Sequence, residues 1–296
     1  MSDSHPSGAN PLASIHSWPA LERPVLVMCM DGWIDAGLAA GNALGHLVEA
    51  MPHELVATFD ADELIDFRAR RPVMRIVNGV DKELRWAEIK LRAATNRTGR
   101  TVLILSGPEP DMKWHRFVAE VVSLSSRLGV ELVVGLGAFP APVPHTRPVR
   151  LVGTSTDSDL AARVGYLPAS IEVPAGVQGA LEVAFGEAGI PAVGLWARVP
   201  HYLAAMPYPA ASAALLDGLA RIAEIEIDTD ALHAAAAASN QQIAQLIAGS
   251  EEHTALVRQL EAQHDSELPT EPTDFGDLPS GDEIAAELER FLRGER

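Results

Sequence analysis

Four short runs made almost entirely of apolar residues mark the first two thirds of this chain. They cover positions 24–30, 101–105, 131–136 and 191–196. An apolar run of strand length is typical of a strand that is buried on both faces, as in the centre of a parallel or mixed sheet. Shorter strands are also expected at 151–155 and 170–173. The pattern therefore predicts a central sheet with both faces covered.

Amphipathic segments lie between these strands and predict helices that pack on the sheet. In segment 114–128, apolar residues recur every three or four positions and form one stripe, which Gly129 ends. Another helix is expected to follow Asp35, whose carboxylate can accept hydrogen bonds from the free amides of the first turn. That helix covers 35–50, and further helices are expected at 177–188 and 210–225. This alternation predicts an α/β fold, a three-layer α/β/α sandwich with a mixed central sheet.

The region 54–95 follows a different, β-rich pattern. Asn78-Gly79 is a hairpin signal, because both residues tolerate positive φ. The expected strands cover 55–59, 73–77 and 83–89. Charged residues alternate with apolar ones along the last of these, which predicts an antiparallel edge hairpin with one face in water.

Composition divides the chain into four parts. They are residues 1–22, 23–227, 228–264 and 265–296. The first lacks a usable period and predicts a loose N-terminal arm or an edge extension, and the second is the α/β domain. The third is rich in Ala and Gln and predicts a helical hairpin, with helices at 230–249 and 250–264. The fourth predicts an acidic linker followed by a short terminal helix at 282–293.

Charge limits the classes of partner. The net charge is −17, from 40 acidic and 23 basic residues. Such a surface repels a polyanion unless it carries a strong basic patch. The densest basic cluster, between Arg68 and Arg75, is flanked by acidic residues and is interpreted as a solvated face of mixed sign. Nucleic acid is therefore not an expected partner.

Two further features concern the compartment. No apolar run approaches the roughly 20 residues that a membrane-spanning helix needs, and residues 1–11 show no signal-peptide pattern. Cys29 is the only cysteine, which excludes an intrachain disulfide and fits a reducing compartment. Because Cys29 lies within an apolar strand, we expect it in the core. The expectation is a cytoplasmic protein without a membrane partner.

Candidate chemistry is expected where the strands end, because ligands of open α/β sheets collect beyond the carboxyl ends of the strands. The segments in question are 31–35, 106–110, 135–140 and the proline-rich stretch after position 196. Asp31 and Asp35 are four residues apart and could face one cleft, but Asp35 is already explained as a helix cap. Trp33, Gly137 and Phe139 are further candidates for contact with a ligand or a second subunit.

A proline-rich loop at 140–148 holds the densest group of polar candidates. Prolines stiffen the chain before His145, and Arg147 could bind a carboxylate or phosphate with two parallel hydrogen bonds. The alternative is a rigid surface loop in which Arg147 pairs with an acid of its own chain or of a neighbour. Exposed aromatic residues beside prolines suit a subunit interface at least as well as a ligand pocket.

Several common sites are missing from the sequence. Gly135-x-Gly137 is followed by Pro140 and opens no helix, so a dinucleotide site is rejected. The sequence contains neither a phosphate loop nor a Gly-x-Ser-x-Gly elbow. Its ten histidines show no metal-ligand spacing. We therefore assign no catalytic residue, no metal and no cofactor.

Three motifs together resemble a known family. They are Asp-Gly-Trp-Ile-Asp-Ala-Gly at 31–37, Gly-Leu-Gly-Ala-Phe-Pro at 135–140 and Pro-His-Thr-Arg-Pro at 144–148. They are similar to the bacterial, actinobacterial-type branch of the proteasome assembly chaperone two family, from residue 22 to residue 225. The resemblance implies a phosphorylase/hydrolase-like sandwich, a tendency to form homo-oligomers and no established catalytic residues. Relatives assist proteasome ring assembly, often through a tail that ends hydrophobic-Tyr-x, which this chain lacks.

Two functional hypotheses follow. The first is a non-enzymatic scaffold or assembly factor that associates with itself, with a trimer as the stoichiometry to test and proteasome subunits as further partners. The second is an enzyme or small-molecule binder of phosphorylase/hydrolase-like type, which would use Asp31, His145 and Arg147 at the strand ends. This second hypothesis rests on fold analogy. The first is favoured, because the sequence shows no catalytic constellation.

Overall fold

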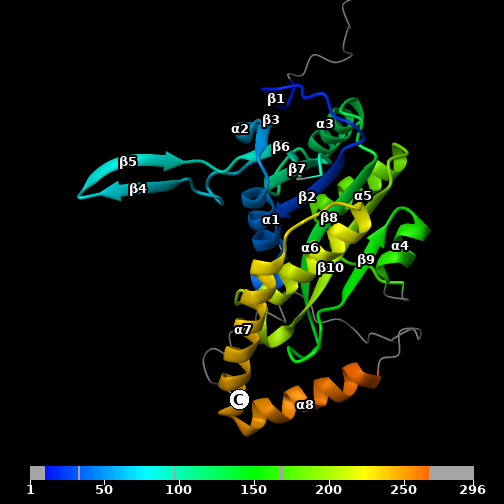
Figure 1. Ribbon diagram of the computed structural model, residues 1–296. Helices are drawn as coiled ribbons and strands as arrows, with labels where there is room; N and C mark the ends of the chain where they lie inside the picture. The colour runs from blue at the N-terminus through cyan, green and yellow to red at the C-terminus, as the bar shows by residue number, and fades with distance from the viewer. Residues whose placement is uncertain (1–10, 33, 97, 167–169, 267–296) are drawn as a thin grey trace, which may run out of the picture.

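The computed structural model describes residues 11–32, 34–96, 98–166 and 170–266. Its centre is an eight-stranded mixed sheet with helices on both faces (Figure 1). In spatial order its strands are β1 (Ala13–Ile15), β3 (His53–Phe59), β6 (Ile89–Thr95), β7 (Thr101–Pro108), β2 (Val25–Asp31), β8 (Leu132–Ala141), β10 (Ala192–Pro200) and β9 (Leu151–Ser155). Strands β7, β2, β8 and β10 are parallel, and antiparallel strands flank them on both sides. The predicted α/β sandwich with a mixed sheet is confirmed.

The central strands are apolar on both sides because a helical layer covers each face. Along β2, Val25 and Val27 pack toward one layer, whereas Leu26 and Met28 pack toward the other. The first layer contains α1 (Ala39–Ala50) and α6 (Pro209–Ala223); the second contains α3 (Trp114–Arg127) and α5 (Val177–Glu187). Cys29 is buried in the first core, as expected, and burial raises the pKa of its thiol.

The predicted hairpin exists but does not lie on the sheet. Strands β4 (Val73–Val77) and β5 (Val80–Arg85) form a separate two-stranded sheet that projects from the sandwich (Figure 1). Asn78 and Gly79 have φ of 51° and 78°, the conformation that a two-residue hairpin turn requires. The expectation of one covered face is wrong, because every residue of both strands is exposed.

Two other strand predictions need correction. Ile89 belongs to β6, a central-sheet strand, and the second strand of the hairpin ends at Arg85. Residues 170–173 form no strand, and Ile171 and Val173 are exposed. Residues 13–15 form the edge strand β1, which pairs with β3.

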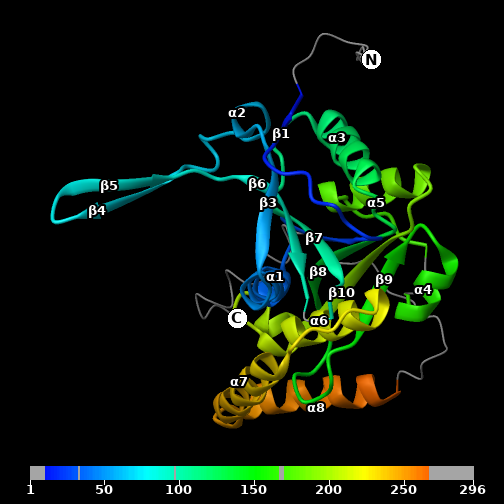
Figure 2. The same cartoon turned by 45° about the horizontal axis from the view of Figure 1, so that its top comes forward.

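Two helices follow the sandwich where helices were expected. They are α7 (Asp230–Ala248) and α8 (Glu251–Ser266). Ile243 of α7 packs into the first core, and α8 buries Val257, Leu260 and His264, which recur at helical spacing. Figure 2 shows both helices beyond α6. The helix expected at 282–293 lies outside the described residues.

The smaller elements connect the layers. They are η1 (Ala36–Leu38), α2 (Ala61–Leu64), α4 (Ser158–Val164) and η2 (His201–Leu203). Across the parts of the chain that the structure describes, no helix is both long enough and apolar enough to cross a membrane.

Candidate functional site

The carboxyl ends of the four parallel strands meet at one edge of the sheet, where the sequence places its candidates. β2 ends at Asp31, which is exposed, and the carbonyl oxygen of Asp31 accepts a hydrogen bond from the backbone N–H of Glu109 at 3.0 Å. Partial desolvation raises the pKa of the Asp31 carboxyl; nearby Arg70 opposes this shift and Asp35 adds to it. Trp33 lies outside the described residues.

Glu109 is a site residue that sequence reasoning missed, although it lies in one of the strand-end segments. One oxygen of its carboxylate accepts a hydrogen bond from the backbone N–H of Val177, the first residue of α5. A carboxylate at a helix N-terminus satisfies a free amide and interacts favourably with the helix dipole. Glu109 therefore fixes α5 against the ends of β7 and β2.

Asp35 caps a helix, as the sequence predicts, but across an intervening turn. Its two carboxylate oxygens accept hydrogen bonds from the backbone N–H groups of Ala40 and Gly41, at 2.9 and 3.0 Å. The 3₁₀ turn η1 lies between the cap and α1, and Gly37 within it has a φ of 69°. The N–H of Gly37 donates to the carbonyl of Ala204, which ties this turn to the residue after η2.

Gly137 and Phe139 lie within β8 and not in a loop beyond it, because β8 continues to Ala141. Gly137 faces the ring of Trp196 on β10, and a Cβ at position 137 would lie 2.4 Å from Cζ3 of that ring. The glycine therefore makes room for the tryptophan. Phe139 is half-buried and is the ladder partner of Arg198. Neither residue lies in a loop.

His145 is buried and is held by Tyr202, which follows β10. The backbone N–H of His145 donates to the Tyr202 hydroxyl at 2.9 Å, and Nδ1 of the imidazole lies 2.9 Å from the same oxygen. Burial lowers the pKa of His145, against an opposing effect of Glu261. Burial also raises the pKa of Tyr202 to about 12. Both groups are therefore neutral near pH 7.

Arg147 binds carboxylates, and these belong to its own chain. Its Nε and Nη2 donate to the two carboxylate oxygens of Asp265 at 2.8 and 2.6 Å, and Nη1 donates to Glu261 at 3.2 Å. Arg147 lowers the pKa of Asp265 through these hydrogen bonds. Thr146 donates to Glu261 as well. The loop thus fastens α8 to the sandwich, which is the second of the two roles considered for Arg147.

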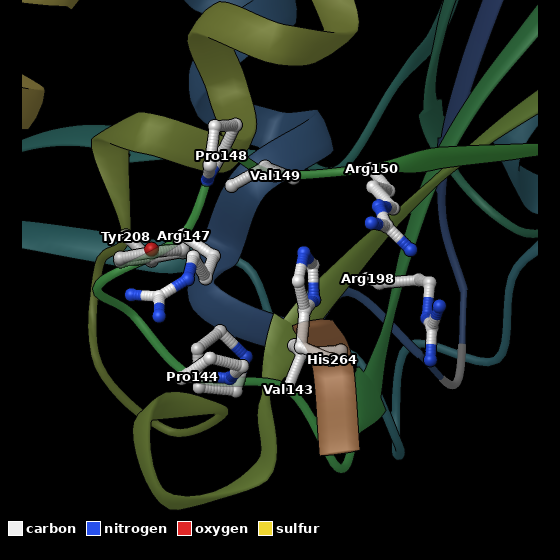
Figure 3. Close-up of a pocket in the computed structure, with 10 residues that line it drawn as sticks. Val143, Pro144, Arg147, Pro148, Val149, Arg150, Arg198, Tyr208 and His264 are labelled. Atoms are coloured by element: carbon white, nitrogen blue, oxygen red, sulfur yellow. The ribbon is translucent and has the colours of Figure 1, made fainter. Parts of the chain in front are cut away.

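A small cavity lies behind this loop. It has a volume of about 10 Å³ and its lining includes Arg147, Arg198, Tyr208 and His264 (Figure 3). A cavity of that size holds about one water molecule. Asp31 and Asp35 are not among the residues that line it. The structure therefore does not bring Asp31 and the His145 loop into this cavity.

A buried polar cluster beneath α5 was not found from the sequence. Glu182 of α5 accepts a hydrogen bond from the Thr154 hydroxyl at 2.9 Å, and Trp196 Nε1 donates to the same hydroxyl at 3.1 Å. Burial raises the pKa of Glu182 to about 7, against opposing hydrogen bonds from Thr154 and Gln178. The only signal in the sequence was a pair of glycines within strands, Gly135 and Gly194. They leave room for the side chains of Gln178 and Glu182, which pack against them.

The opposite, amino-terminal edge of the sheet carries a larger open depression of about 300 Å³. Charged residues in its lining form ion pairs: Glu131 pairs with Arg23 at 2.5 Å and with Arg100 at 3.0 Å. No sequence motif points to this edge, and its charges already neutralise each other.

Comparison with solved structures shows close relatives. The chain is 35% identical to a Mycobacterium tuberculosis protein of unknown function, covering 89% of this chain and 94% of that one, with a TM-score of 0.82. It is 36% identical to a proteasome-assembly chaperone homologue of the same organism (79% and 99% covered, TM-score 0.73). It is 37% identical to a PAC2 family protein of Streptomyces avermitilis (79% and 99% covered, TM-score 0.71).

Two further comparisons complete this picture. A search of curated proteins gave no match. The sequence model of the PAC2 family matches residues 29–247, which is most of the chain and includes both the strand-end residues and the loop of His145 and Arg147. The chain belongs to the PAC2 family.

Proposed function

We propose that this chain is a non-enzymatic, chaperone-like assembly factor that associates with itself and acts in the cytoplasm. One observation carries the proposal: the polar residues at the carboxyl edge of the sheet are engaged with their own chain. Asp35 caps α1, His145 bonds Tyr202, and Arg147 holds α8. A scaffold needs surfaces for partners, whereas a metabolic enzyme needs an open cleft with convergent polar groups.

The choice of partner rests on similarity. A relative at 36% identity is described as a proteasome-assembly chaperone homologue, so proteasome subunits are the first partners to test. Self-association is the second part of the proposal, with a trimer as the stoichiometry to examine. Closed cyclic oligomers are the common outcome when one chain assembles with itself.

The test is native mass spectrometry of the tagged chain after gentle purification from its own host, with bound partners identified. The expected result is a homo-oligomer that also carries proteasome α or β subunits in a fixed ratio. The control is an extract of the untagged host on the same resin. Recovery of the oligomer without any proteasome subunit would contradict the proteasome link, and recovery of a monomer would contradict self-association.

A second candidate function is a small-molecule binder or enzyme of phosphorylase/hydrolase-like type. It is favoured by Nε2 of His145, which is buried and has no hydrogen-bond partner within the described residues. Buried polar atoms normally find a partner, and a ligand or a water molecule could supply one. A thermal-shift screen with nucleosides, phosphates and short peptides tests this function. A saturable turnover that disappears in Asp31→Ala would favour it over the scaffold.

A further inference from the structure

One face of the central sheet carries a row of polar side chains across five neighbouring strands (Figure 1). Ladder partners on adjacent strands point to the same face. From the edge of the sheet to its centre, the row consists of Ser14 on β1, Thr58 on β3, Lys90 on β6, Ser106 on β7 and Cys29 on β2. Because Cys29 is buried in the first core, the row lies on the face of α1 and α6. Ser106 is buried, Lys90 and Thr58 are half-buried and Ser14 is exposed, so solvent reaches the outer half of the row.

Lys90 and Arg92 bring two cations to this row. Ile89 and Leu91 pack into the second core, so the alternating residues Lys90 and Arg92 point to the opposite face of β6. Two residues on one face of a strand have Cα atoms about 7 Å apart, within reach of a common point for long side chains. Lys90 is the ladder partner of Ser106, and Nη1 of Arg92 donates to the Ser106 hydroxyl at 2.8 Å. The two cations therefore flank one buried hydroxyl.

Arg92 differs from the other half-buried cations. In the part of the chain that the structure describes, the half-buried Lys and Arg side chains are Arg70, Lys90, Arg92, Arg100 and Arg147. All of them except Arg92 form an ion pair with a carboxylate. Arg92 forms no ion pair with a described residue, and its acceptor is the neutral hydroxyl of Ser106. A partly desolvated charge is normally paired, so the environment of Arg92 indicates an anionic ligand.

Ser106 can contribute a further hydrogen bond to such a ligand. Its side chain is 92% buried and its oxygen accepts from Arg92. Among the described residues, none accepts a hydrogen bond from this hydroxyl. A hydroxyl donates one hydrogen bond while it accepts another. A ligand oxygen beside Arg92 would therefore meet the guanidinium and the Ser106 proton together.

We propose that Arg92, Lys90 and Ser106 form a binding site for one phosphate group, either free phosphate or the monoester of a small molecule. The planar fork of an arginine fits two phosphate oxygens, and a lysine ammonium adds a point charge. A phosphate monoester carries about 1.5–2 negative charges at pH 7 and three strong acceptor oxygens, so it satisfies both cations and the hydroxyl at once. This site goes beyond the assembly role proposed above and does not depend on it.

Charge favours phosphate over the other anions. Glu88 already pairs with Lys90, and a carboxylate ligand would only exchange one single negative charge for another. A phosphate brings more charge, and it can displace Glu88, whose side chain is 51% exposed and can turn to water. A polyanion would meet the repulsion of a chain with a net charge of −17. The site therefore suits a single phosphate and not a nucleic acid.

Isothermal titration calorimetry of the full chain tests the site. The probes are inorganic phosphate, phenyl phosphate and benzoate, with sodium chloride holding the ionic strength constant. Both phosphates are expected to bind, and benzoate about tenfold more weakly, because it offers fewer oxygens and less charge. Tighter binding of phenyl phosphate than of inorganic phosphate would support a monoester as the ligand, and the reverse would support free phosphate. Absence of binding by either phosphate overturns the site, and a preference for benzoate overturns the choice of phosphate.

Arg92→Gln and Ser106→Ala test whether the phosphate binds at this place. Arg92→Gln should weaken phosphate binding by about tenfold or more, and Ser106→Ala by about threefold, because each removes donors to a charged ligand. Arg100→Gln is the matched control: Arg100 is also half-buried, but it pairs with Glu131 at the opposite edge of the sheet, so binding should match that of the wild type. Phosphate binding that survives both test variants, or that weakens equally in the control, overturns the assignment.

The melting temperature without ligand shows whether each variant folds. If Arg92→Gln does not fold, Arg92→Lys takes its place, because it keeps the charge and loses the fork that holds two oxygens. Arg92→Lys is expected to weaken phosphate binding by about threefold and to leave the weak binding of benzoate less changed. Unchanged phosphate affinity in both Arg92→Lys and Ser106→Ala would overturn the site.

Discussion

The sandwich and the projecting hairpin of β4 and β5, here called the hairpin arm, are built from similar apolar residues, but they differ in what covers those residues. Along β7, residues 102–105 are fully buried, because α-helices lie on both faces of the sheet. Along β4, Val73 and Ile76 are 57% and 60% exposed, because the hairpin lies apart from both helical layers. The same residue types are thus buried between layers in one region and exposed in the other.

Apolar runs in the sequence therefore include two kinds of residue, those buried in the sandwich and those exposed on the hairpin arm. Removal of an apolar side chain from the sandwich costs transfer free energy and leaves a cavity, whatever the oligomeric state. Removal of one from the hairpin arm leaves no cavity and exposes little new surface, because the arm is already exposed. Stability should therefore respond much more strongly to substitutions in the sandwich than to substitutions in the arm.

The largest effect is expected from a pair of matched truncations. Phe117 of α3 is fully buried against Phe59, with ring centroids 5.0 Å apart. Phe117→Ala should lower the free energy of unfolding by about 3–5 kcal/mol, whereas Ile76→Ala should change it by about 0.5 kcal/mol or less. Urea unfolding of dilute protein measures both. Equal losses for the two variants would show that the arm is packed within its own chain.

Glu182→Gln is expected to have the next largest effect, which depends on pH. Burial raises the pKa of Glu182 from 4.5 to about 7, so the folded chain holds this proton more tightly than the unfolded chain does. Stability is therefore lost as the pH rises from about 4.5 to 7, a loss on the order of 3 kcal/mol relative to a side chain that does not titrate.

The measurement for Glu182 is the melting temperature of the wild type and of Glu182→Gln between pH 4.5 and 8. The two curves should diverge as the pH rises, with the variant more stable relative to the wild type at pH 8. Curves that stay parallel over this range would contradict a buried, raised carboxyl beneath α5.

A smaller effect is expected where glycine makes room for a ring. A Cβ at position 137 would lie 2.4 Å from the Trp196 ring, so the ring must shift in Gly137→Ala. We expect a loss of about 1–3 kcal/mol from this overpacking. In Gly45→Ala, nothing lies within 4 Å of the new Cβ on α1, and a gain of up to about 1 kcal/mol is expected. Chemical denaturation of both variants decides whether β8 and β10 are packed as tightly as described.

Sequence reasoning succeeded where local pattern determines structure. Continuous apolar runs located the parallel strands, and Asn78-Gly79 located the hairpin turn. It failed for β6, in which Lys90 and Arg92 interrupt the apolar residues, so that the apolar pattern predicts no strand beyond Ile89 and assigns Ile89 itself to the hairpin. Alternation also cannot tell whether an apolar face is covered by its own chain, which is why the exposure of the arm was missed.

The same limit applies to the candidate site: roles that depend on neighbouring residues could be predicted from the sequence, and roles that depend on distant residues could not. The capping role of Asp35 could be predicted, because a cap acts on amides a few residues away. The acids that Arg147 binds could not, because Glu261 and Asp265 are more than one hundred residues away in sequence. Glu182 was missed because a single acid on an amphipathic helix is normally solvated, and only the folded structure shows it buried.

The smallest effect is expected for Arg147→Ala, which releases α8 without opening the core. The side chain joins the loop to Asp265 and Glu261, but it is partly exposed, so global stability should change little. Hydrogen exchange followed by mass spectrometry should show faster exchange across α8 and unchanged exchange across α5. In Arg147→Lys, the rate of exchange across α8 should lie between the rates of the wild type and of Arg147→Ala, because an ammonium group cannot donate the pair of hydrogen bonds that Asp265 accepts.

Arg85→Ala on the hairpin arm is the matched control for this release of α8. Arg85 is exposed and lies on β5, so its loss should leave the exchange of α8 at the wild-type rate. If Arg85→Ala accelerated the exchange of α8 as strongly as Arg147→Ala does, the release would not be specific to the ion pairs of Arg147 with Glu261 and Asp265, and α8 would be held to the sandwich in another way.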